Sequence, residues 1–156
     1  MNTLFPVCLM LHLMALTLMA GTTLVDFMAY QSLWKIITEK KELSTGLLQL
    51  MAKLPRIIGI GAGVLVLSGI GMMALTHGVF GEQLWFRIKF VLVILLMLNG
   101  LVIGRRLGNK LRNLINTDGP AFTDQVTKVR ANLTKFHLVQ LSIFFLIIFL
   151  SAFKFN

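Results

Sequence analysis

Residues 84–103 read LWFRIKFVLVILLMLNGLVI, and only Arg87 and Lys89 in this run carry charge. A helix needs about 20 predominantly apolar residues to cross the hydrocarbon core of a bilayer. The run therefore predicts a transmembrane segment. Backbone inside a bilayer must satisfy its own hydrogen bonds, and the sequence lacks the ten-residue alternating segments that are typical of membrane β-barrels, so the segment is expected to be a helix.

Three further apolar runs, at about 4–29, 57–76 and 138–153, are long enough to serve as spans. With a mean hydropathy of +0.82 and only 13% charged residues, the composition excludes an ordinary soluble domain. A single cysteine, Cys8, excludes an internal disulfide and any site built from several cysteines. The sequence therefore predicts an all-α integral membrane protein. It forms one domain over residues 1–156, a four-helix bundle with up-down connectivity.

The basic residues are distributed unevenly between the segments that connect these spans. Twelve of the 15 lie in two connections, and they are Lys35, Lys40, Lys41, Lys53, Arg56, Arg105, Arg106, Lys110, Arg112, Lys128, Arg130 and Lys135. The other connection and the C-terminus hold only Arg87, Lys89 and Lys154. The positive-inside rule then places both basic connections in the cytoplasm of a bacterial inner membrane, with the N- and C-termini outside. Topology and the attraction of basic residues to the lipid bilayer account for the net charge of +9. We expect no nucleic-acid partner, because no nucleic-acid-binding motif accompanies the charge.

Both basic connections contain helical patterns. A stripe of Leu107, Leu111, Leu114 and Ile115 continues the third span until 116–120, and Val126, Val129, Leu133 and Phe136 resume one towards the fourth. These stripes predict a helical hairpin that protrudes into the cytoplasm. In the first connection, Ser44 is expected to cap a short helix that ends at Leu54 and lies on the membrane surface.

Small residues recur along the second span. Gly59 and Gly63 form a small-xxx-small pair, and Ser68, Gly69 and Gly71 extend the thin surface. Such pairs let helix backbones approach closely. We expect this face to pack inside the bundle or at a homodimer contact.

His12 is the most informative polar residue, because it lies about 12 Å deep in the first span at 1.5 Å per residue. Most of the polarity of that span falls on its helix face, which carries His12, Leu16, Met19, Thr23, Asp26 and Tyr30. Neutral imidazole is a favoured axial ligand of haem iron. The alternative is a hydrogen bond from His12 to a neighbouring helix. His77, at the end of the second span, is either a solvated histidine or a second ligand.

Arg87 and Lys89 open the third span on the same side of the membrane as His12. They are candidates to neutralise the carboxylates of a bound tetrapyrrole or another anion, whereas the alternative for Lys89 is that it snorkels to the interface. Met10, Met14 and Cys8 near His12 also leave a copper site open.

A second polar set lies towards the cytoplasmic ends of the spans and comprises Asp26, Tyr30, Arg56, Asn99, His137 and Gln140. The simplest interpretation is an ion pair between Asp26 and Arg56, together with interhelical hydrogen bonds that hold the bundle shut. A proton path or a site for a quinone headgroup is the alternative.

Several of these motifs resemble a known superfamily. They are Leu11-His12-Leu13 with Ala20-Gly21, Pro55-Arg56 before Ser68-Gly69-Ile70-Gly71, and Leu84-Trp85 with Lys89. Over residues 4–106 the sequence resembles the small four-helix membrane proteins that include HemJ-type protoporphyrinogen oxidases and the CopD copper-resistance domain. The resemblance implies haem b at His12 and a matching role for Lys89.

The sequence also departs from the HemJ-type pattern. It has Val25-Asp26-Phe27 where a Pro-Arg is typical, and Leu98-Asn99-Gly100 where a histidine is typical. These differences bear on the oxidoreductase activity more than on the fold. They leave the second axial ligand open between His77 and a methionine such as Met19.

Three functions therefore remain open. The first is a haem-b-binding redox protein that passes electrons to quinone or to a protein partner. The second is a non-catalytic membrane subunit or scaffold whose polar residues only join helices. The third is a copper-handling membrane protein.

The topology is testable by cysteine labelling from outside the cell in a Cys8→Ser background. We expect Thr45→Cys and Thr117→Cys to resist a membrane-impermeant maleimide, because both lie in the basic connections. Labelling before and after permeabilisation provides the measurement. Efficient labelling of intact cells at either position would reverse the orientation.

Overall fold

The computed structural model describes residues 3–39, 44–77, 83–118 and 124–153, with side chains given except at 114–118. Lys40, Lys41 and Lys154 lie outside the described residues. The described chain is helical, and its elements are α1 (Leu4–Thr38), α2 (Thr45–Leu75), α3 (Leu84–Leu98), η2 (Asn99–Gly104), α4 (Arg105–Asp118) and α5 (Asp124–Ala152). Four of its helices are long and apolar enough to cross a membrane. The predicted all-α, four-helix membrane architecture is therefore confirmed.

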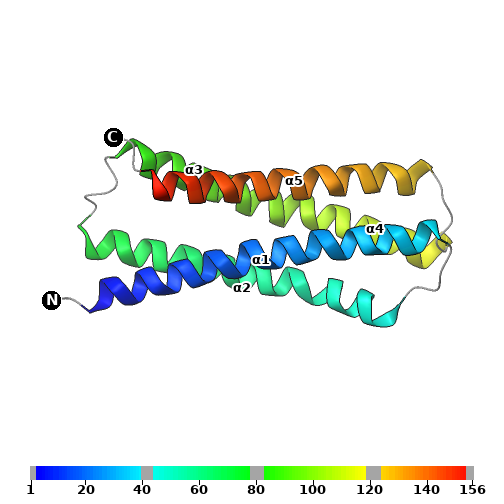
Figure 1. Ribbon diagram of the computed structural model, residues 1–156, viewed down its shortest axis with the longest axis horizontal. Coiled ribbons are helices and arrows are strands. Elements are labelled where there is room, and N and C mark those ends of the chain that lie inside the picture. The colour runs from blue at the N-terminus through cyan, green and yellow to red at the C-terminus, as the bar shows by residue number, and fades with distance from the viewer. Residues whose placement is uncertain (1–2, 40–43, 78–82, 119–123, 154–156) are drawn as a thin grey trace.

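The third membrane helix is built from three elements, α3, η2 and α4, which follow one another without a break. Its middle part, η2, is a π-helix, a form that occurs mostly as a local insertion in α-helices and often at functional sites. The helices alternate in direction, so that α1 begins and α5 ends at the same end of the bundle (Figure 1).

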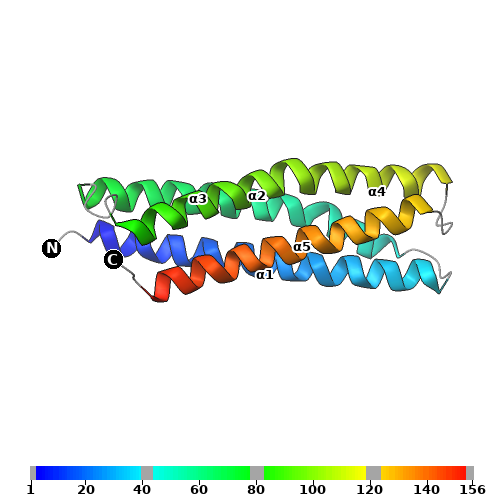
Figure 2. The ribbon, with the colours of Figure 1, turned by 90° about the horizontal axis from the view of Figure 1, so that it is seen from above.

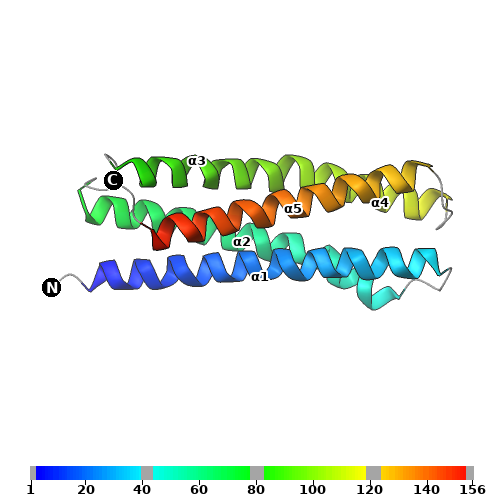
Figure 3. The ribbon, with the colours of Figure 1, turned by 45° about the horizontal axis from the view of Figure 1, so that its top comes forward.

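Helix packing is unequal around the bundle. α1 packs against α2, and α5 contacts both α1 and the third membrane helix. Figure 3 shows α5 between these two neighbours, and Figure 2 shows that α5 crosses α1 at an angle. By contrast, α2 and the third membrane helix share no extensive contact in the described part of the chain. The bundle is therefore closed on three sides and loosely closed on the fourth.

The apolar core has two parts along the bundle. One is centred on Met19, Leu65, Leu96 and Phe144, and draws on all four membrane helices. The other lies at the end where α1 terminates, which we call the basic end because Lys35, Arg105, Lys110, Arg112 and Lys128 lie there. Its buried members are Leu33, Trp34, Ile37, Leu111, Val126, Val129 and Leu133.

The second core modifies two sequence predictions about the basic end. The segments before and after 119–123 are helical, as predicted, but they do not protrude as a lone hairpin. The last turns of α1 and the first turns of α2 pack against them. The predicted surface helix that ends at Leu54 is also wrong, because it is the first part of α2, which continues through Pro55. Leu47, Leu48 and Met51 gain burial against this core.

The glycine contact between helices also differs from the prediction. A Cβ atom built on Gly59 or Gly63 would meet nothing within 4 Å, whereas one on Gly61 would lie 2.6 Å from Cγ of Met19 and 3.6 Å from the Ala15 carbonyl oxygen. Gly61 is about 200° around the helix from Gly59, so it lies on the opposite face. The close contact of α1 with α2 therefore depends on Gly61, and the Gly59–Gly63 face is left open.

Gly61→Leu should lower the free energy of unfolding by about 1–3 kcal/mol, because its side chain overlaps buried Met19. Gly63→Leu is the matched control, since its new side chain enters open space. Thermal or denaturant unfolding in detergent measures both. Equal destabilisation by the two variants would contradict this assignment of helix faces.

Candidate functional site

His12 is held against α2 through one ring nitrogen. Its Nδ1 lies 3.1 Å from the carbonyl oxygen of Leu65 and 3.0 Å from Oγ of Ser68. The Leu65 oxygen can only accept, and the Ser68 hydroxyl already donates to the Val64 carbonyl at 2.7 Å. Nδ1 therefore carries the proton and donates it, so the neutral imidazole has its lone pair on Nε2. Among the described residues no hydrogen bond is recorded to Nε2.

The structure keeps two of the residues that the sequence grouped with His12, Lys89 and Cys8, on the same side of the bundle as its imidazole, and leaves two others exposed. Lys89 is half-buried and within electrostatic range of the His12 imidazole. Cys8 faces α2 as His12 does, because its Sγ lies 3.3 Å from where a Cβ on Gly71 would be. Arg87 and His77 are exposed.

The thioethers also differ from one another in their surroundings. Met19 is buried against Gly61, whereas Met10 and Met14 lie on the outer surface of the bundle. Within the described ranges, no group of three or more His, Cys, Asp or Glu side chains could hold a metal ion.

The second polar set is brought together, with one change of partner. His137 is 1% exposed, and its Nε2 lies 3.0 Å from Oδ2 of Asp26. The expected ion pair of Asp26 with Arg56 is not formed, since Arg56 is exposed and the described partner of Asp26 is His137. The physical reason is the rotation of α2 about its own axis, which places Pro55 towards the polar set and turns Arg56 outward.

The hydrogen bonds of His137 fix the net charge of this pair. Nδ1 is 2.8 Å from the carbonyl oxygen of Leu133, which only accepts, so Nδ1 donates its proton there. A single proton then lies between Nε2 and Asp26, on one atom or the other. In both arrangements the pair is neutral overall, which suits its burial.

Two further contacts complete the set. The side-chain amide of Asn99 donates to Oε1 of buried Gln140 at 2.7 Å. This bond joins η2 to α5 and is an interhelical hydrogen bond of the kind expected from the sequence. The ring of Tyr30 lies 5.2 Å from that of His137, centroid to centroid. Every buried side-chain nitrogen or oxygen in the described part of the chain has a hydrogen-bond partner.

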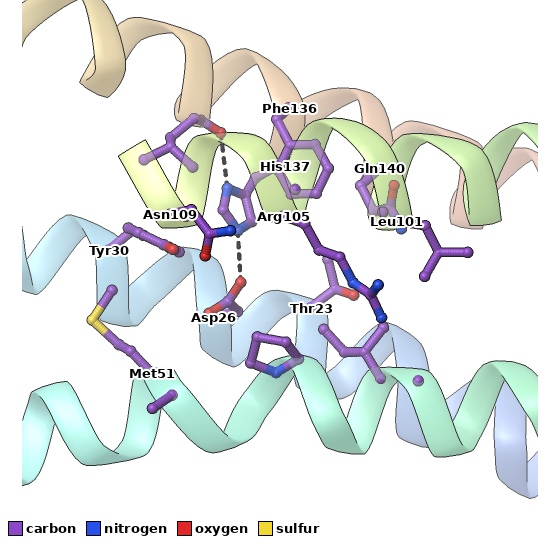
Figure 4. Close-up of a pocket in the computed structure, with 18 of the residues that line it drawn as sticks. Thr23, Asp26, Tyr30, Met51, Leu101, Arg105, Asn109, Phe136, His137 and Gln140 are labelled. Carbon is purple, nitrogen blue, oxygen red and sulfur yellow. Dashed lines mark hydrogen bonds and ion pairs between the residues drawn. The ribbon is translucent and has the colours of Figure 1, made fainter. Parts of the chain in front are cut away.

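A cavity of about 760 Å³ opens beside this polar set, in the gap between α2 and the third membrane helix. We call it the lateral cavity. Figure 4 shows its polar side chains, with Asp26 and His137 on the α1–α5 side and Arg105 extending from the third membrane helix towards α2. Its remaining walls are apolar and include Met19, Leu48, Met51, Ile58, Leu96, Met97, Leu101 and Leu133.

Much of the lining of the lateral cavity was not predicted from the sequence. Arg105, Asn109 and Arg112 line it, although their positions next to a span indicated only topology. Gly100, Gly104 and Gly108 line it too, and their spacing of four was the signal that could have shown a small-residue face on the third helix. A Cβ on Gly104 would lie 2.9 Å from the Phe136 ring, so Gly104 allows α5 to approach closely.

Comparison with protein-family models, curated protein sequences and solved structures gives no match for this chain.

A double-mutant cycle tests the partner of Asp26. Asp26→Ala and His137→Ala should each lower the free energy of unfolding by about 1–3 kcal/mol, because each leaves a buried polar partner unsatisfied. Their coupling energy should reach about 1 kcal/mol or more, whereas the control cycle of Asp26→Ala with Arg56→Ala should give less than about 0.5 kcal/mol. Reversible unfolding in mixed micelles provides the measurement. A larger coupling to Arg56 would refute the described pairing.

Proposed function

We propose that this protein is a haem-b-binding redox protein of the bacterial inner membrane, with His12 as an axial ligand. The observation that carries the proposal is the hydrogen bonding of His12. Histidines that ligate a metal nearly always donate their other ring proton to a carbonyl, carboxylate or water, which fixes the tautomer and the ring orientation. His12 has this arrangement through Leu65.

The charge near His12 also suits a haem. Lys89 supplies a half-buried cation on a different helix, within electrostatic range of the imidazole. A propionate carboxylate there would offset the cost of keeping an ammonium group in apolar surroundings. Arg87, two residues closer to the start of the same helix, is the second cation in this proposal.

In this proposal haem iron supplies one-electron chemistry, while the protein supplies the ligand, its orientation and the exclusion of water. Leu65 and Ser68 hold the imidazole ring in place, and the helices around it keep the dielectric constant low. The second axial position is left to His77 or a methionine. Electrons would pass to a quinone or to a protein partner.

The alternative of a non-catalytic membrane subunit is favoured by a different observation. The two polar pairs, Asp26 with His137 and Asn99 with Gln140, join separate helices, and each buried side-chain nitrogen or oxygen in them has a hydrogen-bond partner. Such pairs stabilise a bundle without any cofactor. Haem spectroscopy separates the two functions.

Protein expressed with ample haem and gently solubilised should show a Soret band. His12→Ala should abolish or shift the Soret and alpha bands, because it removes an iron ligand. Lys89→Gln should reduce haem occupancy at unchanged band positions, because it removes only an anion-binding charge. Ser68→Ala should retain the bands, since Leu65 still accepts the Nδ1 proton.

Lys53→Gln is the matched control for loss of a basic residue, since Lys53 is exposed on the part of α2 away from His12. Its spectrum and occupancy should equal those of the wild type. Absence of Soret absorption from the wild type would refute the haem function and favour the subunit. Bound copper measured in that haem-free protein would instead indicate the copper-handling function.

A further inference from the structure

We propose that the lateral cavity binds one anionic amphiphile, with the anionic headgroup at Arg105 and Arg112 and the apolar chain directed towards Met19 and Gly63. This inference does not depend on haem at His12, because His12 does not line the cavity.

The size and shape suit a long, narrow ligand. At about 760 Å³ the cavity falls in the range of small-molecule sites, roughly 300–1,000 Å³. Its lining on α1 extends from Met19 to Leu33, which is about 21 Å along the helix at 1.5 Å per residue. On α2 the lining from Leu48 to Gly63 gives about 22 Å in the same way. The cavity therefore follows the bundle axis over about one bilayer leaflet with its headgroup region, roughly 20–22 Å.

The charged side chains of the lining that have no recorded ion-pair partner among the described residues are the arginines, and they lie towards the basic end. Arg112, Asn109 and Tyr30 lie there, with Arg105 about two helical turns from Arg112. At the other extreme the lining is mostly apolar and includes Met19, Ala62, Gly63, Leu96 and Met97, while the amide of Gln140 lies 3.5 Å from the Leu96 carbonyl oxygen. A ligand that matches this lining has one polar end and one apolar end.

The charge of the lining selects an anion. Asp26, the carboxylate in the lining, is neutralised by His137. In the described part of the chain no carboxylate is recorded as an ion-pair partner of Arg105 or Arg112. Figure 4 shows that Arg105 extends into the gap rather than away from it. A guanidinium group offers a planar fork of donors that matches carboxylate or phosphate oxygens.

The route of entry is lateral, from the membrane. Gly59 and Gly63 on α2 line the cavity on one side, and Gly100, Gly104 and Gly108 on the third membrane helix line it on the other. A Cβ on Gly59 or Gly63 would meet no atom within 4 Å, so these positions are free of helix contacts. Because α2 and the third helix do not pack together extensively, a chain from the adjacent leaflet can enter between them.

Native mass spectrometry of the purified protein in detergent tests the proposal, with oleate as the probe. We expect one saturable oleate adduct. Oleyl alcohol and a decyl-substituted benzoquinone, which have similar apolar character but uncharged headgroups, should bind at least about tenfold more weakly, because they form no charge-assisted hydrogen bonds. Oleoyl-lysophosphatidate distinguishes a phosphate headgroup from a carboxylate, and tighter binding of either identifies the headgroup.

Variants locate the ligand. Arg105→Gln should weaken oleate binding about tenfold, whereas Arg106→Gln, the adjacent arginine outside the lining, should leave it unchanged. Gly63→Leu should abolish the adduct by filling the cavity. Gly21→Leu is its control, because Gly21 is equally free of contacts and lies outside the lining. His12→Ala should bind oleate as the wild type does, so failure of the haem proposal and of this one are distinguishable.

Gel filtration and circular dichroism establish that each variant is folded, and Gly59→Leu replaces Gly63→Leu if the latter is not. Unchanged oleate binding in folded Gly63→Leu or in Arg105→Gln would overturn the proposal. Equal or tighter binding of the quinone would also overturn it, because it would assign the cavity to a neutral headgroup. Absence of any saturable adduct on the wild type would do the same.

Discussion

The structure depends on one constraint, that polar groups inside a hydrocarbon layer must find partners within the protein. α1 carries His12, Thr23, Asp26 and Tyr30 along one face, and this face cannot turn towards lipid without losing those partners. Leu65 and Ser68 of α2 satisfy His12, and His137 of α5 satisfies Asp26. The polar face of α1 therefore fixes which helices are its neighbours.

The same constraint explains why the bundle is closed unevenly. The contact between α1 and α2 is tight because Gly61 admits Met19, and α5 approaches the third helix closely where Gly104 admits Phe136. In the described part of the chain no comparable contact joins α2 to the third helix. Packing of the other three sides leaves the lateral cavity as the space that side chains do not fill. Its open side lies between two of the helices that are long and apolar enough to cross a membrane.

The two candidate sites differ in how many ring nitrogens of the histidine have a recorded hydrogen-bond partner among the described residues. The imidazole of His12 has one nitrogen engaged and one with no recorded partner, which is the arrangement that metal ligation needs. Both nitrogens of His137 are engaged, one by Leu133 and one by Asp26, so this histidine serves as a neutral structural pair and not as a ligand. In our proposals the first site binds a cofactor and the second forms one wall of an amphiphile site. A redox protein of the membrane could use both.

The sequence by itself determined the number of spans, their helical form and the inward face of α1. These properties depend on local hydrophobicity and on the regular period of the α-helix, and both can be read along the sequence. The sequence also identified His137, Gln140 and Asn99 as residues of one polar set, because they lie at similar depths. Only the tertiary structure decided that Asp26 pairs with His137 and not with Arg56, that Gly61 and not Gly63 makes the helix contact, and that Arg105 extends into a cavity. The physical reason is that depth in a membrane follows from position along a helix, whereas choice of partner depends on how the helices are rotated and arranged around one another.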